Sequence, residues 1–254
     1  MDSQLLLSCA LDIGEEMLIC GAEVYRVEDC IRRICTSYGC KRVDVFTITS
    51  SIVVTIVDMK HERVTQTRRI ASYNTDLSKL DKLNQISRMM CSETPELSEI
   101  KNQLKKIKAE KKYPFIVECL AYAFIAGAFT VFFGGTFLDG AISLIIGLFL
   151  RLIVFAATRS KLNAIFANFV SSFCMSFLAF TAAAIGLGVS VDNIVIGNIM
   201  LLIPGVGLTN SLRDMISGDT MAGALRLLEA VLIAISLAAG YILSALIAGG
   251  IGLC

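Results

Sequence analysis

The residues best suited to chemistry lie in the second half of the chain, where an apolar segment runs into Pro204-Gly205 and restarts with polar residues. Proline lacks a backbone donor and clashes with the preceding turn, so a helix breaks there and leaves carbonyls and N–H groups unpaired. In transporters such breaks form binding sites, because a half-helix N-terminus meets a carboxylate and freed carbonyls accept a cation. The candidate substrate or pathway residues are Asn198, Pro204, Gly205, Gly207, Thr209, Asn210, Arg213, Asp214 and Asp219.

These candidates divide by chemistry. Asn198, Thr209 and Asn210 would supply uncharged hydrogen bonds, and Asp214 would hold an ammonium or carry a coupling proton. The alternative is that Pro204-Gly205 only ends a membrane span and that Arg213 and Asp214 form a solvated loop pair. The sequence leaves both interpretations open.

Other site chemistry finds little support. The single histidine, His61, lies in a charged turn, and the nine cysteines form no CxxC pair, so we expect reduced thiols, no metal site and no cofactor. No Gly-rich phosphate loop, HExxH or GxSxG motif occurs. No catalytic residue is predicted.

Composition separates the chain into two parts. It has 254 residues, of which 55% are hydrophobic, and a mean hydropathy of +0.70. Of its 23 Lys and Arg residues, about 18 fall within positions 1–112, as do about 16 of its 22 Asp and Glu residues. One part therefore suits water and the other suits lipid. The first residues lack a basic segment, so we expect no cleavable signal peptide.

Residues 1–112 are predicted to form a small α+β domain. In some segments apolar residues recur at helical spacing. Other segments are rich in Val, Ile, Thr and Phe, which is typical of a β-hairpin. The expected elements are helices at 3–20 and 22–38, a hairpin at 41–58, a polar third strand at 62–70, and helices at 77–92 and 96–112.

Residues 113–254 are predicted to form an α-helical multi-pass membrane domain. A helix needs about 20 apolar residues to cross a bilayer. By this measure we expect about five spans, of which the fourth is broken at Pro204-Gly205. The predicted spans are 115–133, 138–157, 163–186, 191–207 and 223–252.

Basic residues give the orientation. Arg159, Lys161 and Arg213 lie in two loops, and the alternate loops have no Lys or Arg, so the positive-inside rule places residues 1–112 in the cytosol and the C-terminus outside a cytoplasmic membrane. A run of lysines precedes the first span, where an anionic-lipid contact is favoured over nucleic-acid binding. This run consists of Lys101, Lys105, Lys106, Lys108, Lys111 and Lys112.

Two segments carry a family resemblance. The stretch GAEVYRVED at 21–29 resembles the N-terminal signature of the threonine/serine exporter family. The stretch PGVGLTNSLRDMISGD at 204–219, continued at 223–230, resembles its second signature. The resemblance covers essentially the whole chain. It implies export of small hydrophilic metabolites, threonine and serine in the founding members and dicarboxylates in others.

The resemblance also bears on partners and on the first domain. The chain looks like the first half of an exporter, which implies a separately encoded small membrane subunit with the other half; self-association is left open. The carried-over cytosolic signature residues are Gly21, Glu23, Arg26 and Glu28, which would face the membrane domain or bind a ligand. The simpler alternative is a local Glu23–Arg26 ion pair beside a helix boundary at Gly21. The family's cytosolic domain has been likened to a hydrolase, but we find no nucleophile.

Three functions follow from these observations. The first is a subunit of a secondary transporter that exports threonine and serine, or alternatively a succinate-like dicarboxylate. The second is a membrane-anchored enzyme with its site in the cytosolic domain. The third is a sensor or regulatory subunit of a separate channel, in which changes at 204–219 would leave transport intact.

Overall fold

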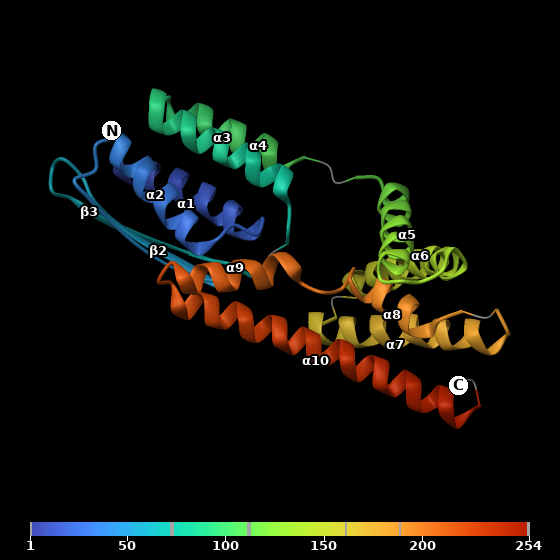
Figure 1. Cartoon of the computed structure of the whole chain (residues 1–254). Helices are drawn as coiled ribbons and strands as arrows, with labels where there is room; N and C mark the ends of the chain where they lie inside the picture. Colours follow the sequence, from blue (N-terminus) through green and yellow to red (C-terminus); the bar gives the residue numbers. More distant parts are fainter. Residues whose placement is uncertain (1, 72–73, 111–112, 161, 188, 253–254) are drawn as a thin grey trace. The chain divides into compact units, whose positions relative to one another are not determined.

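In the computed structural model the chain is mostly helical, with one small antiparallel sheet near its N-terminus (Figure 1). The structure describes residues 2–71, 74–110, 113–160, 162–187 and 189–252. Packing divides the chain into two compact units: Met1–Lys111 with Gly205–Leu228, and Lys112–Pro204 with Glu229–Cys254. The second signature segment thus packs with the first unit. The sequence-based division at residue 112 stays a prediction.

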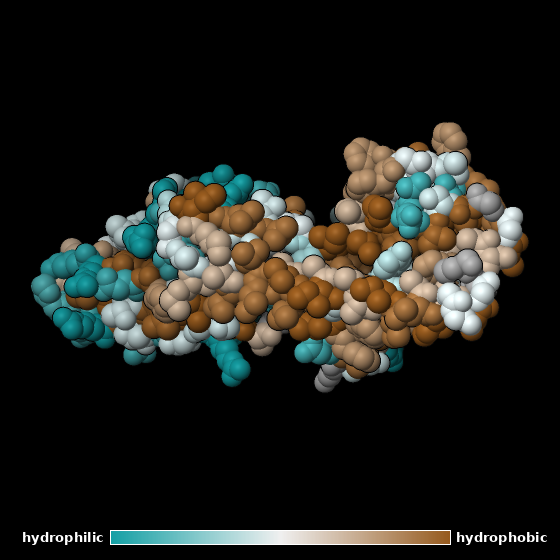
Figure 2. Space-filling model, turned by 60° about the horizontal axis from the view of Figure 1, so that its bottom comes forward, coloured by the Kyte–Doolittle hydropathy of each residue, from teal (hydrophilic) through white to brown (hydrophobic). Residues whose placement is uncertain are grey.

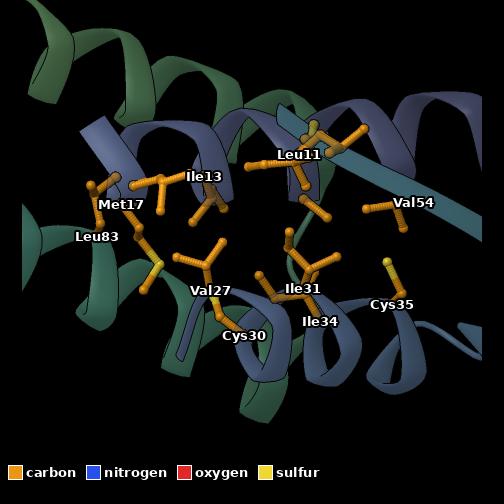
Figure 3. Packing of buried hydrophobic residues seen from close by; sticks show 14 of the residues in the cluster. Leu11, Ile13, Met17, Val27, Cys30, Ile31, Ile34, Cys35, Val54 and Leu83 are labelled. Carbon is orange, nitrogen blue, oxygen red and sulfur yellow. The ribbon is translucent and has the colours of Figure 1, made fainter. Parts of the chain in front are cut away.

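Two helices, α1 (Ser3–Ile19) and α2 (Val24–Ser37), form the centre of the first unit's core. The Asp2 side chain begins α1 by accepting hydrogen bonds from two backbone N–H groups of its first turn. Gly21 follows α1 with a φ of 91°, a conformation that glycine adopts at little cost. In Figure 3 the facing side chains of α1 and α2 meet in a continuous apolar layer, to which Leu83 and Val54 contribute from neighbouring elements.

A three-stranded sheet covers one side of these helices. Its strands β1 (Arg42–Ile48), β2 (Ser51–Val57) and β3 (Arg63–Arg69) are antiparallel and stand in the order β1-β2-β3. Alternate side chains of a strand share one face, and on β2 the buried face carries Ile52 and Val54 against the helices. The predicted hairpin and third strand are confirmed.

Helices α3 (Leu77–Glu93) and α4 (Leu97–Lys108) cover α1 and α2 on the side away from the sheet (Figure 1). Their apolar side chains join the same core, while the basic last turn of α4 points outward; there Lys108 forms an ion pair with Glu16 at 3.0 Å. Of the basic residues used above for orientation, Lys111, Lys112 and Lys161 lie outside the described residues.

Four helices of the described chain are long and apolar enough to cross a membrane. They are α5 (Phe115–Phe132), α6 (Phe137–Arg159), α7 (Ala164–Ala184) and α10 (Thr220–Gly250). Many of their large apolar side chains are exposed, as expected for surfaces that face lipid. On the face in Figure 2, apolar residues cover much of these helices, and hydrophilic residues gather on the first unit. The predicted fold class is confirmed.

The predicted fourth span differs from the structure. Helix α8 (Val191–Ile199) has 9 residues and rises only about 14 Å, less than half of a bilayer core. Residues 200–204 form a turn, in which the N–H of Leu201 donates to Asn198 and that of Leu202 donates to Ile199, and α9 (Gly205–Ile216) begins after Pro204. The helix is interrupted at Pro204, as predicted. A count of apolar residues does not reveal the turn before Pro204, so the described chain has four span-length helices where five were expected.

Candidate functional site

The structure brings the two signature segments together within the first unit. The chain turns at Gly21, and two backbone carbonyls there both accept hydrogen bonds from the second signature segment. The carbonyl of Gly21 accepts a hydrogen bond from Asn210 Nδ2 at 2.8 Å, and that of Ala22 accepts one from Arg226 Nη2 at 3.0 Å. We call this contact between residues 21–24 and residues 210–226 the signature junction.

Asp214 lies at the centre of the signature junction and is fully buried. Its Oδ1 accepts a hydrogen bond from the N–H of Val24 at 3.0 Å, and its Oδ2 accepts one from Arg226 Nη1 at 3.2 Å. Val24 is the first residue of α2, so the carboxylate meets the positive end of that helix. Burial raises the pKa of Asp214, whereas Arg226 and the Val24 N–H act in the opposite direction. Both carboxylate oxygens are therefore engaged inside the protein.

Arg226 reaches this position because α9 and the start of α10 pack closely. A Cβ at Gly223 would lie 2.5 Å from the carbonyl oxygen of Ser211, so only glycine fits this crossing. Glu229 lies three residues after Arg226 on α10, a spacing that predicts an ion pair between them, and this prediction is wrong: the partner of Arg226 is Asp214. Beside Asp214, Arg226 meets a buried carboxylate and also the Ala22 carbonyl as a second acceptor. Glu229, one turn further along the same helix, would not provide this second acceptor.

At the rim of the signature junction, Arg213 pairs with Glu23. This pairing replaces the local Glu23–Arg26 pair considered from the sequence. Arg26 is exposed on α2, and Glu28 turns to the sheet, where its Oε1 accepts a hydrogen bond from the Thr47 N–H at 2.8 Å. Burial raises the pKa of Glu28, and the Thr47 hydrogen bond opposes this. Two of the four residues named for the first signature, Gly21 and Glu23, thus contact α9 through hydrogen bonds.

Asn198 belongs to the second unit and lies in a different polar cluster. It is 1% exposed, and its Nδ2 donates to Ser143 Oγ at 3.1 Å and to the Ile194 carbonyl at 2.9 Å. Ser143 in turn shares a 2.6 Å hydrogen bond with Thr130 Oγ1. Among the described residues, Asn198 Oδ1 has no partner. The cluster joins α5, α6 and α8 through uncharged groups.

The remaining candidates lie around the break. Pro204 precedes α9; Gly205 and Thr209 are exposed in its first turns, and the Thr209 hydroxyl donates to the Gly205 carbonyl at 3.0 Å. Gly207 is half-buried on the same helix. Asp219 lies just before α10, and its N–H donates to the Asp214 carbonyl. These positions remain predictions as site residues.

A further ion pair within the second unit was not expected from the sequence. Arg151 of α6 pairs with Glu118 of α5, and its guanidinium lies 5.0 Å from the centre of the Phe115 ring and 5.6 Å from that of Tyr122. Because each lies near one end of its predicted span, the sequence alone favours separate contacts of Arg151 and Glu118 with lipid headgroups. No spacing rule links them, because they lie on different helices.

Comparison with known proteins decides the family. The family model of the threonine/serine exporters, ThrE, matches residues 8–248. The chain belongs to the threonine/serine exporter family. Residues 8–248 include both segments that meet at the signature junction, together with the four span-length helices up to residue 248. The family resemblance drawn from the sequence is confirmed.

One curated member of the threonine/serine exporter family gives a measure of length. A protein of Corynebacterium glutamicum named threonine/serine exporter is 25% identical over 244 residues, which are 92% of this chain and 50% of that protein. The chain thus spans about half the length of this relative. No solved structure matches the chain. As a member of an exporter family with four apolar span-length helices, this is a multi-pass membrane protein of a transporter family.

Proposed function

We propose that the chain is one half of a secondary transporter that exports small hydrophilic metabolites, with threonine and serine as first substrates and a succinate-like dicarboxylate as the alternative. The observation that carries this proposal is the family match over residues 8–248 in a chain that spans half the length of its relative. A second membrane subunit would supply the other half.

In this proposal the substrate crosses beside the interruption between Ile199 and Gly205. The backbone carbonyls of residues 200–203 accept no backbone hydrogen bond from the described part of the chain, and the first N–H groups of a helix such as α9 lack partners within the helix. Freed carbonyls suit an ammonium, and a helix N-terminus suits a carboxylate. An amino acid carries both groups.

In this proposal the signature junction couples movement of the first unit to the broken segment. Because both oxygens of Asp214 are engaged by Val24 and Arg226, we assign to this residue the task of holding α9 against α2. Movement of the first unit would pass through α9 to the broken segment, with the first unit in the cytosol as the basic loops at Arg159 and Arg213 favour. The substrate ammonium would then be bound by the backbone carbonyls of residues 200–203 and not by Asp214.

The test is export of labelled threonine, serine and succinate from loaded cells. The chain is expressed alone, with the candidate partner subunit, and with the partner as the variants Asp214→Asn and Gly249→Ala. A Cβ at Gly249 meets no atom within 4 Å, so this variant is a matched control for expression and insertion. Immunoblots of membrane fractions check that every chain is present.

The expected result is export only with the partner, lost in Asp214→Asn and retained in Gly249→Ala. Which solute leaves the cell decides between the amino acids and the dicarboxylate. Export by the chain alone would refute the need for a second subunit. Export unchanged in Asp214→Asn would refute the coupling role and favour a regulatory subunit.

A further inference from the structure

A cavity of about 470 Å³ opens between α2 and α3 in the first unit, away from the signature junction residues. This volume lies within the range of small-molecule binding sites. Its lining is mainly polar and contains three arginines, Arg26, Arg33 and Arg88. The exporter proposal does not account for a pocket here, although Arg26 and Asp29 of the first signature segment line it.

The charges of the lining favour an anion. Arg33 is neutralised by Asp29, whose carboxylate lies 2.7 Å from its Nε. Asp81 keeps its negative charge, because its hydrogen-bond donor at 2.8 Å is the neutral amide of Gln85, and the three arginines and two aspartates of the lining leave one net positive charge. Within the described ranges, neither Arg26 nor Arg88 has a carboxylate oxygen within 4.0 Å. Two guanidinium groups are therefore left without a carboxylate partner at one cavity.

The remaining groups of the lining add no opposing charge. The thiol of Cys30 and the hydroxyl of Ser87 lie 3.0 Å apart and share a hydrogen bond. Burial raises the pKa of Cys30 to about 11, so the thiol is neutral at cytosolic pH. The Ser87 hydroxyl and the Asn84 amide are further groups that can donate to an oxyanion.

We propose that this cavity binds a small multivalent oxyanion, a phosphate-bearing or polycarboxylate metabolite, between Arg26 and Arg88. Guanidinium groups match carboxylate and phosphate oxygens in pairs of charge-assisted hydrogen bonds. A ligand here would contact α2, the helix whose first turn binds Asp214, and so would act on the element that holds α9. The site is separate from the substrate path proposed above and does not depend on it.

The test is isothermal titration of the full-length purified protein in detergent with inorganic phosphate, citrate and threonine. Arg26→Gln and Arg88→Gln each remove one unpaired guanidinium. Arg32→Gln is the matched control, because Arg32 is exposed on the same helix and does not line the cavity.

We expect saturable binding of phosphate or citrate, weakened about tenfold or more by Arg26→Gln and by Arg88→Gln and unchanged by Arg32→Gln. Threonine, with no net charge, should not displace phosphate or citrate from this cavity. The proposal is overturned if neither anion binds saturably, if all three variants weaken anion binding equally, or if threonine displaces the bound anion. Export activity is not part of this readout, so the two proposals fail independently.

Discussion

The two units use polar residues in opposite ways. At the signature junction, charged side chains are buried: Asp214 and Arg226 pair inside the first unit, where the rest of the core is apolar. Where α5, α6 and α8 meet in the second unit, the buried polar groups are mostly uncharged, as at Thr130, Ser143 and Asn198. Glycines there bring backbones close, and a Cβ at Gly197 would lie 2.7 Å from the Thr130 backbone nitrogen.

The difference is the one expected from the predicted division between water and lipid. In water an apolar core forms by burial, and a charge pair within it adds specific partners at a cost in desolvation. In lipid no hydrophobic force draws helices together, so close packing of small residues and modest hydrogen bonds must hold them. Buried charge therefore positions α9, whereas α8 is positioned by close packing and, at its start, by the hydrogen bond of the Ser190 N–H to Asp139.

The largest expected effect comes from Arg226→Met. It leaves the Asp214 carboxylate buried without its counter-ion, which we expect to destabilise the first unit by about 3–5 kcal/mol. Thermal unfolding of the purified chain and amide hydrogen exchange of α2 and α9 measure it. Arg159→Met, at an exposed position, is the control. Unchanged exchange in α2 and α9 would show that the pair does not hold the signature junction.

Gly197→Ala tests the packing of the second unit. The added methyl group would overlap the Thr130 side chain and press on its backbone, so we expect a loss of about 1–3 kcal/mol. Hydrogen exchange should rise in α5 and α8 and stay unchanged in α2. Gly249→Ala, with open space around it, should have no such effect. Equal stability of the two variants would refute the close approach.

Asn210→Ala removes one uncharged hydrogen bond from the signature junction, the bond to the Gly21 carbonyl. We expect a loss of about 0.5–1.5 kcal/mol, smaller than for Arg226→Met because no charge is stranded. Chemical denaturation of the purified chain measures this loss. A loss of stability as large as that of Arg226→Met would mean that a stranded buried charge costs no more free energy than one lost uncharged hydrogen bond.

The smallest effect is expected from Arg213→Ala at the exposed rim. Its pair with Glu23 is partly open to water, so the loss should be about 0–1 kcal/mol and should shrink as salt is added. Unfolding at low and high ionic strength measures this. A loss that is large and independent of salt would instead place this pair with the buried charges.

Local rules predicted the elements well and the site poorly. Segments rich in Val, Ile, Thr and Phe predicted the hairpin that forms β1 and β2, and Pro204 predicted the interruption before α9. The same rules gave Arg226 the wrong partner, because helical spacing considers only residues on one helix. They also counted 191–207 as one span, since apolar length does not reveal a turn such as the one at Leu201.

By itself the sequence determined most of the local structure and the family, because each depends on residue type and short spacing. Only the tertiary structure decided that Asp214 binds Val24, which is 190 residues away, and that Asn210 binds the Gly21 carbonyl. A buried charge takes whatever partners the packing brings to it, and a backbone carbonyl has no mark in the sequence. The physical reason is that the free energy of such contacts depends on burial, which arises only once the chain has folded.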